Sequence, residues 1–537
     1  MSDYCEDAKE LDLLITRMKD LLVDFMHQSR QPDAPIVDYK EPHELERIMD
    51  FSLPDIGVGP EGIFPTITQT LQYNVNTFSP RFMDKLYAGS SPIGVMAELL
   101  LAGLNGNSHV YHVAPVFTLM EIHVTRALAR LFGFKGEHAG GLSSPGGSAS
   151  NQLAMVTARN ALFPEIKRHG YFPRPSAKEM EELELQGYRV YLGPAASSTY
   201  GKLIAFTSSA GHYSLQKAGA VMGLGTENIV DVPCDSYGAI IPSELERLVQ
   251  EHIALGHTPF FINVTAGTTV LGAFDPIRPC AEIAKKYNCW SHVDGSWGGS
   301  TVFVPELAKT LLDGSELANS ITVNPHKMLQ TSLQCSLLLV QDISVFPQAN
   351  ALKANYLFHG QTHDLGDGTL GCGRRSDAVK LFLGWRYYGK LGYQARIEKS
   401  MSNVKRFVEL LAQDDFRGQR IQMLRLGYDD DDEDGVEKDR VMPSLLQVCF
   451  WYRPRGSRLI DWPWMERVTK AIHARIRARG KFMIDYAPLG THLPIFFRVV
   501  LNPPTIRELD LVKLVEEILE CGEEVTDSVP IPECCRC

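Results

Sequence analysis

The spacing of hydrophobic residues predicts a helical start to the chain. Between residues 8 and 27 the apolar side chains recur at the spacing of a helix face. The residues of this stripe are Leu11, Leu14, Met18, Leu21, Leu22 and Phe25. We expect the stripe to pack against the chain itself or against a partner subunit. A Pro- and Gly-containing connector at about 52–66 and a further helix near 93–103 follow.

From about 110 to 390 the pattern changes to short apolar runs that alternate with helical stretches. The runs that we interpret as buried strands are 203–207, 259–264, 289–294, 321–324 and 336–340. The segment 276–287 has the composition of a crossover helix between two of them. This alternation predicts an α/β fold with a mainly parallel sheet covered by helices. Ligands of such sheets bind at the carboxyl ends of the strands.

A second, smaller α/β region is predicted after about residue 395. It consists of a helix, strands at 445–452 and 495–501, and helices at 462–479 and 505–520. We therefore expect three parts: an N-terminal helical segment over 1–109 that intertwines in a dimer, a large domain over 110–394, and a small C-terminal domain over 395–537. The acidic run at 428–435 is interpreted as a solvated connection, because it lacks the spaced ligands of a calcium loop.

Composition excludes some classes of function. The 537 residues carry a net charge of −11, which argues against a general binder of nucleic acid or of anionic membranes. We find no apolar run of membrane-spanning length and no basic, apolar leader at the first residues. The 11 cysteines have no metal-ligand spacing, so we expect reduced thiols and no metal in a cytoplasmic protein. The cysteine-rich end at 534–537 is interpreted as a tail without lipid.

One lysine and one aspartate follow two of the predicted strands and suggest a chemistry. Lys327 comes directly after the strand 321–324, and Asp294 ends the strand 289–294. A desolvated lysine has a lowered pKa, and its neutral amine can form a Schiff base with pyridoxal phosphate (PLP). A carboxylate beside the pyridine nitrogen keeps that nitrogen protonated. A single lysine after a strand is ordinarily a surface residue, and only the combination favours the cofactor.

Three further features fit the same cofactor. The glycines and serines of 144–151 precede a helix, whose free N–H groups and dipole can bind a phosphate. His212 lies in a turn after the strand 203–207 and could stack on the pyridine ring, although a lone histidine is more often a packing residue. Arg498 stands in the middle of a strand, where a buried arginine needs a partner. A substrate carboxylate and an internal salt bridge are both possible.

The chain resembles the group II PLP-dependent amino-acid decarboxylases of fold type I, nearest the glutamate and cysteine-sulfinate decarboxylase branch. The matching stretches are 114–121, 144–151, 211–214, 266–269, 292–294, 324–327 and 496–498. The resemblance implies that Lys327 carries the cofactor, that Asp294 binds the pyridinium and that His212 stacks on the ring. It also implies a homodimer. The remaining cofactor residues that it implies are Gly147, Ser148, Ala149, Thr268, Asn324 and His326.

The resemblance implies a carboxylate-binding role for Arg498, but other substrate positions depart from the family. Tyr87 is aromatic, as in the sulfinate branch, whereas Asn107 follows the glutamate pattern. His109 stands where the branch commonly has Phe or Tyr, and His112 replaces an expected Glu. We therefore expect α-decarboxylation of an acidic L-amino acid, namely glutamate, aspartate or cysteine sulfinate.

A second departure concerns the product. His363 occupies the place of a loop Tyr that protonates the substrate Cα in many family members. Imidazole can donate a proton near neutral pH, so we expect decarboxylation to the amine. If His363 donates poorly, the alternative is oxidative deamination to an aldehyde. Decarboxylation of an aromatic amino acid is a further alternative. Residues 174–200 have the character of an insertion.

Overall fold

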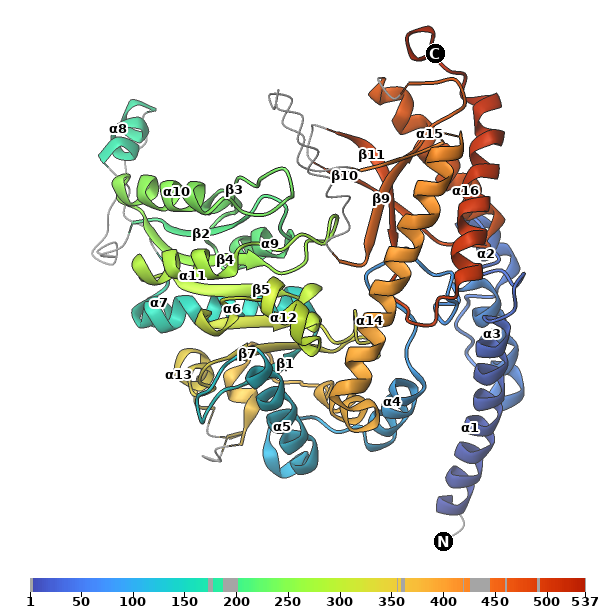
Figure 1. The fold of residues 1–537 in the computed structure, drawn as a ribbon. Coiled ribbons are helices and arrows are strands. Elements are labelled where there is room, and N and C mark those ends of the chain that lie inside the picture. Colours follow the sequence, from blue (N-terminus) through green and yellow to red (C-terminus); the bar gives the residue numbers. More distant parts are fainter. Residues whose placement is uncertain are drawn as a thin grey trace. The chain divides into compact units, whose positions relative to one another are not determined.

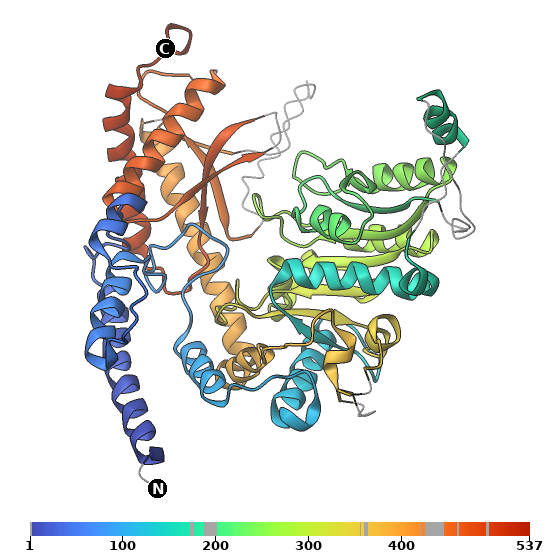
Figure 2. The same ribbon diagram turned by 180° about the vertical axis from the view of Figure 1, so that it is seen from behind.

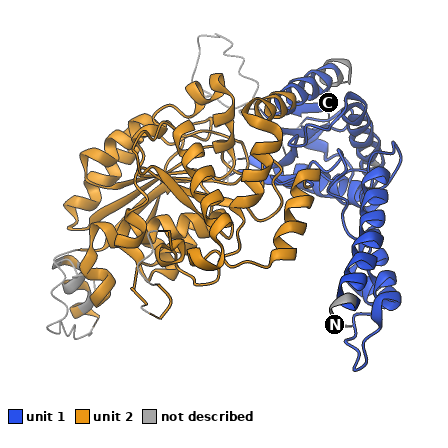
Figure 3. Cartoon of the chain, turned by 90° about the horizontal axis from the view of Figure 1, so that it is seen from below, with its two compact units in different colours: residues 1–89, 400–424, 446–537 blue, residues 90–399, 425–445 orange. Residues whose placement is uncertain are grey.

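The computed structural model describes residues 3–171, 177–186, 201–354, 356–358, 363–418, 420–424, 445–458, 461–489 and 493–536. The acidic run at 428–435 and most of the expected insertion at 174–200 lie outside these residues. The chain forms two compact units (Figure 3). Unit 1 contains residues 1–89, 400–424 and 446–537, and unit 2 contains residues 90–399 and 425–445. The predicted division at 109 and 394 stays a prediction.

Unit 2 is built on a seven-stranded sheet with the order β1-β7-β6-β5-β4-β2-β3. The strands from β3 across to β6 are parallel to one another, whereas β7 is antiparallel to both of its neighbours. This mainly parallel α/β sheet confirms the predicted fold class. The strands are β1 (Gly140–Ser144), β2 (Leu203–Ser208), β3 (Ile229–Val232), β4 (Thr258–Thr265), β5 (Trp290–Gly295), β6 (Ser320–Val323) and β7 (Ser336–Val340).

Helices cover both faces of this sheet, which explains why its central strands are buried on both sides. Every residue of β2, β5, β6 and β7 is buried. Figures 1 and 2 show α6 and α11 on opposite faces. The helices of this unit are α4 (Pro92–Leu104), α5 (Pro115–Leu131), α6 (Gly147–Leu162), α7 (Pro164–His169), α8 (Ala177–Leu185), α9 (Ser214–Val221), α10 (Pro242–Ala254), α11 (Ile277–Lys286), α12 (Pro305–Leu311) and α13 (Val345–Asn350).

Unit 1 contains a four-stranded antiparallel sheet with the order β10-β11-β9-β8. Two helices, α15 and α16, lie side by side against it (Figure 1). The strands are β8 (Ile421–Met423), β9 (Gln447–Tyr452), β10 (Asp485–Leu489) and β11 (Leu493–Val500). The helices are α1 (Asp3–Gln28), α2 (Pro42–Ile48), α3 (Gly59–Tyr73), α15 (Trp462–Arg479) and α16 (Glu508–Ser528), together with the second half of α14 (Ala378–Gly418).

The predicted connector at 52–66 is wrong in its second half, because α3 begins at Gly59. Pro60 lies in the first turn of this helix, where the missing N–H has no intrahelical partner to lose. Phe64 is buried, and the Arg17 guanidinium lies 4.1 Å from the centre of its ring. Packing against α1 therefore overrides the local signal of the prolines and glycines.

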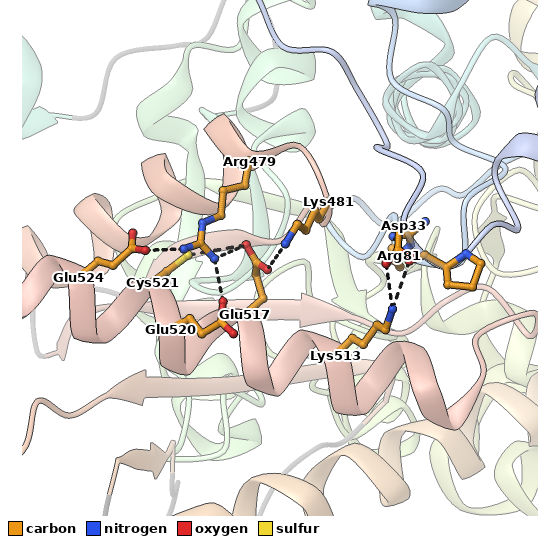
Figure 4. Close-up of polar contacts among 10 residues, drawn as sticks. Asp33, Arg81, Arg479, Lys481, Lys513, Glu517, Glu520, Cys521 and Glu524 are labelled. Carbon is orange, nitrogen blue, oxygen red and sulfur yellow. Dashed lines mark hydrogen bonds and ion pairs between the residues drawn. The ribbon is translucent and has the colours of Figure 1, made fainter.

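Ionic contacts join the helices of unit 1. Figure 4 shows Arg479 at the end of α15 in contact with Glu517, Glu520 and Glu524 of α16. The Nη1 atom of Arg479 lies 2.9 Å from the buried carboxylate of Glu517. Because three carboxylates share one guanidinium, the loss of any single one leaves Arg479 paired.

Membrane-spanning helices and metal-binding clusters are both absent from the described residues. None of their helices is both long and apolar enough to cross a membrane. No group of three or more His, Cys, Asp or Glu side chains within them is arranged to hold a metal ion.

Candidate active site

The carboxyl ends of several parallel strands in unit 2 surround one cavity of about 180 Å³. Thr265 ends β4, Asp294 lies near the end of β5, and Lys327 follows β6. His212 follows β2 and Gly147 begins α6 after β1, so these residues meet at the same edge of the sheet. The full lining is Gly147, Ser148, Asn151, His212, Thr265, Gly267, Thr269, Asp294, Ser296, Trp297, Asn324, His326 and Lys327.

Asp294 is buried and Lys327 is half-buried at this cavity, and each changes the pKa of the other. Burial lowers the pKa of the Lys327 ammonium, and the charge of Asp294 only partly opposes this. Burial raises the pKa of Asp294, but the hydrogen bond from Ser296 and the charge of Lys327 outweigh it and hold this pKa below its usual value. The pair therefore combines a lysine that deprotonates readily with a carboxylate that stays ionised.

A chain of hydrogen bonds orients the Asp294 carboxylate. Asn151 Nδ2 donates to Asp294 Oδ2 at 2.8 Å, and the Ser296 N–H donates to Oδ1 at 3.0 Å. Behind Asn151, its Oδ1 lies 3.1 Å from His292 Nε2, and His292 Nδ1 lies 2.8 Å from Ser320 Oγ. His292 must donate to Asn151 Oδ1 for this chain to be satisfied, which requires a proton on Nε2.

His292 and His326 are neutral in this environment. Burial lowers the pKa of both imidazoles to about 4. His326 Nδ1 lies 2.6 Å from the Cys335 carbonyl and donates to it, which leaves Nε2 for the cavity. Burial also lowers the pKa of His212, whose Nδ1 accepts from the Ser214 N–H at 3.2 Å. These contacts fix the planes of the imidazole rings at the cavity.

The start of α6 at this cavity fits a phosphate. The side-chain hydroxyls of Ser296 and Thr265 also line the cavity, are buried and have no hydrogen-bond partner among the described residues. Gly147 opens α6, and a Cβ on it would lie 2.6 Å from Asn324 Nδ2 and 2.7 Å from Ser296 Oγ. The cradle therefore offers unused hydroxyls and a helix N-terminus that only glycine leaves open. These donors, with Lys327 and Asp294, fit PLP.

Two predicted cofactor residues do not line this cavity. Ala149 lines a neighbouring cavity with Ser143 and Ser144. The Thr268 hydroxyl accepts a hydrogen bond from the Ala273 N–H at 3.0 Å, so it stabilises the turn after β4. Its neighbours Gly267 and Thr269 line the cavity instead.

Three predicted substrate or proton-transfer residues form a second group in unit 2. Asp364 Oδ1 accepts from the Tyr111 N–H at 2.8 Å, and the rings of Tyr111 and His363 are 5.5 Å apart. The Gly366 N–H donates to the His109 carbonyl at 2.9 Å. Asn107 Oδ1 accepts from the Arg374 N–H at 2.9 Å. Asn107, His109 and His363 are thus brought together, and none of them lines the cavity of Lys327.

A buried ion pair supports this second group. The Arg374 guanidinium is paired with Glu121 of α5, and both side chains are at most 5% exposed. Arg374 Nη1 also donates to the Ser108 carbonyl at 2.9 Å, and the Ser143 N–H donates to Glu121 Oε1 at 2.8 Å. This pair joins α5 and β1 to the segment around Asn107.

The remaining predicted substrate residues, Arg498 and Tyr87, lie in unit 1. Arg498 is buried in β11, and its Nη2 donates to Asp485 Oδ2 and to the Asp84 carbonyl, both at 3.1 Å. The Tyr87 ring packs 5.6 Å from that of Phe82. Of the two alternatives left open for Arg498, an internal salt bridge therefore exists.

Asn151, Thr265 and Ser296 were missed as site residues by sequence reasoning. Asn151 ended a recognised motif, but its contact with Asp294 depends on the position of α6 against β5. Ser296 lies two residues after Asp294 in a run of small residues, and this spacing was the available signal. Thr265 carried no local signal other than its place at the end of a strand.

The fold and the cavity define a PLP-binding enzyme of fold type I, and comparisons with known proteins specify the family. The model of the pyridoxal-dependent decarboxylase conserved domain matches residues 42–186 and 188–419. The chain belongs to this family of pyridoxal-dependent decarboxylases. It is therefore an enzyme that uses PLP to decarboxylate an amino acid, as predicted.

Individual relatives lie in the same branch that the sequence resembles. The chain is 38% identical over 476 residues to an L-aspartate decarboxylase of Metarhizium robertsii, covering 88% of this chain and 85% of the relative. It is 32% identical to the glutamate decarboxylase of Drosophila melanogaster, covering 95% and 93%. The crystal structure of mouse CSAD, cysteine sulfinic acid decarboxylase, matches with a TM-score of 0.82 and 30% identity, covering 95% and 98%.

Proposed function

We propose that this decarboxylase acts on an acidic L-amino acid, either aspartate, glutamate or cysteine sulfinate, and releases the amine and CO2. The observation that carries the proposal is the pairing of Lys327 with the buried Asp294 at the strand ends. The substrate class is supported by the relatives that are at least 30% identical, whose names specify these three acidic substrates. They do not favour the aldehyde-forming and aromatic alternatives.

Most residues of the cavity have a role in this proposal. Bound PLP supplies an electron-accepting pyridinium ring. Lys327 holds the cofactor covalently, and Asp294 keeps the proton on the pyridine nitrogen, oriented by Asn151. His212 stacks on the ring. The phosphate is bound by Ser148, Ser296, Asn324 and His326, together with the N–H groups at the start of α6, and Thr265 lies opposite Asp294 in the sheet.

The substrate and the proton donor involve the other groups. Arg498 binds a carboxylate of the substrate, because a buried guanidinium recognises carboxylates through paired hydrogen bonds. Tyr87, Asn107 and His109 limit the length of the substrate. His363, which is exposed, gives a proton to the substrate Cα after CO2 leaves.

The experiment that tests the function is identification of products. The purified protein, supplied with PLP, is incubated separately with aspartate, glutamate, cysteine sulfinate and tryptophan, and products are identified by mass spectrometry. We expect CO2 and the matching amine from at least one of the three acidic amino acids. Turnover of tryptophan alone, or aldehyde with ammonia and peroxide in place of the amine, would overturn the proposal.

We also propose that the protein is a cytoplasmic homodimer that uses its N-terminal segment as the contact. Apolar side chains of this segment are exposed, including Leu53 at 95% and Ile56 at 85%. Exposed apolar surface of this kind is typical of an interface with another subunit. The double variant Leu53→Asp, Ile56→Asp should halve the mass measured by light scattering. Leu185→Asp, an equally apolar exposed position in α8, is the control and should stay dimeric.

A further inference from the structure

Arg498 contacts the carboxylate of Asp485, which has no role in the decarboxylation proposed above. Asp485 and Arg498 lie directly opposite each other on the antiparallel strands β10 and β11. Directly opposite side chains on such strands are in contact distance, and opposite charges attract across the pair. Asp485 Oδ2 accepts from Arg498 Nη2 at 3.1 Å. The strand register therefore builds this ion pair into the sheet.

Two more charges complete a four-membered cluster within unit 1. Lys85 Nζ lies 2.8 Å from Asp485 Oδ2 and 2.8 Å from Asp84 Oδ1. The Asp84 carboxylate is 7% exposed and the Arg498 side chain 8%, whereas Asp485 is 24% and Lys85 48% exposed. The cluster contains two acids and two bases, so its net charge is zero when all four are ionised. Arg498 is not a bare positive charge but one end of a neutral arrangement.

Asp485 is ionised at neutral pH. Burial raises its pKa, but the hydrogen bond from Lys85 and the charges of Lys85 and Arg498 outweigh this and hold the pKa below its usual value. An ionised carboxylate on Arg498 has the same chemistry as the carboxylate of an acidic amino acid. Both carboxylates can accept hydrogen bonds from the same N–H groups of the Arg498 guanidinium.

We propose that Asp485 is a specificity-determining residue, an internal carboxylate that competes with the substrate carboxylate for Arg498. This inference rests on the proposed role of Arg498. An incoming carboxylate replaces Asp485 on the guanidinium, and Asp485 keeps its contact with Lys85. The exchange costs less than exposing an unpaired Asp485 would, since Lys85 remains as its partner. Asp485 thus weakens the binding of every carboxylate ligand to Arg498. A substrate binds there only if its affinity for the guanidinium is high enough to displace Asp485.

The test measures binding of carboxylates that cannot react. Succinate and glutarate are titrated by calorimetry into the PLP-loaded wild-type enzyme and into Asp485→Asn, and both are also measured as competitive inhibitors. We expect Asp485→Asn to bind succinate or glutarate, whichever the wild type binds more tightly, about three- to tenfold more tightly than the wild type does. This is the effect of removing one charged competitor. The KM of the acidic substrate should fall in the same direction, with a smaller change in kcat.

Asp84→Asn is the matched control, because it removes the same charge from the same cluster. The Asp84 carboxylate contacts Lys85 and lies beside Asp485, and the Asp84 backbone carbonyl accepts from Arg498 Nη2. A general field effect would therefore tighten binding equally in both variants, whereas competition for the guanidinium acts through Asp485 alone. Equal tightening in the two variants, or none in Asp485→Asn, would overturn the proposal.

A second variant keeps the proposal testable if Asp485→Asn does not fold. Lys85→Gln leaves Asp485 with Arg498 as its one remaining partner in the cluster, so carboxylate binding should weaken about threefold or more. Unchanged or tighter binding in Lys85→Gln would count against competition. Arg498→Lys tests the proposed role of Arg498 separately from the proposed competition by Asp485. If this variant binds succinate and glutarate as well as wild type, the proposed role of Arg498 is wrong. If only Asp485→Asn is without effect, the competition alone is wrong.

Discussion

The cavity of Lys327 in unit 2 and the charge cluster of Arg498 in unit 1 accommodate their ionisable side chains in different ways. The cavity contains an ionised Asp294 held by hydrogen bonds from Asn151 and Ser296, and lysine and histidines whose pKa values are lowered by burial. The cluster keeps four charged side chains and balances them against one another. The first arrangement favours neutral, reactive bases, and the second favours exchangeable ion pairs.

The difference follows from how each region is built. Parallel strands bring their carboxyl ends to one edge, so side chains from distant segments converge there whatever their charge. In unit 1 the antiparallel strands β10 and β11 place Asp485 opposite Arg498 by register, and partners are fixed pair by pair. Chemistry is therefore concentrated at the strand ends of unit 2, and tuning of binding lies between the strands of unit 1.

The largest effect is expected at the strand ends, from Lys327→Ala. Removal of the amine should lower turnover at least about a thousandfold, because the proposed covalent attachment of the cofactor is lost. The independent measurement is borohydride reduction of the PLP-loaded enzyme followed by peptide mapping. The mass of the cofactor should appear on the peptide that contains Lys327 and on none in the variant. Lys309→Ala, at an exposed position of α12, is the control. A labelled peptide elsewhere would show that the strand-end assignment is wrong.

The sequence predicted the strand-end site better than the cluster. Asp294 lies near the end of a fully buried strand, and Lys327 and His212 follow two others. Such strands are recognisable from local pattern alone. Asn151 and Ser296 needed the packing of α6 against β5, which no local pattern contains. For Arg498 the sequence showed only that a partner must exist. Asp485 is 13 residues away in sequence. Its pairing depends on the register of β10 with β11.

An effect of intermediate size is expected on the free energy of unfolding, and it should differ between an isolated ion pair and a shared one. Glu121→Gln should leave Arg374 as a buried, unpaired charge and lower the free energy of unfolding by about 3–5 kcal/mol. Glu517→Gln in unit 1 should cost about 1 kcal/mol, since Arg479 is partly exposed and keeps Glu520 and Glu524 (Figure 4). Both values come from urea unfolding followed by circular dichroism. Equal losses in the two variants would show that sharing of carboxylates does not protect a pair.

The smallest effect concerns the neutral histidines of unit 2 and appears as a dependence of stability on pH. Burial lowers the pKa of His292 and of His326 to about 4, whereas an unfolded histidine titrates near its usual pKa of 6.5. Between these values the unfolded chain binds more protons than the folded one, so stability is complete above about pH 6.5 and is lost as the pH falls toward 4. Each histidine contributes at most about 1.4 kcal/mol per pH unit to this slope.

His292→Gln retains a donor for Asn151 and removes one titrating group, so the urea midpoint measured between pH 5 and 7 should vary less steeply than in wild type. His138→Gln, a histidine at a separate cavity of the same unit, is the control and should keep the wild-type slope. An unchanged slope in His292→Gln would mean that His292 is protonated in the folded protein, and the cavity would then resemble the charge-balanced cluster of unit 1.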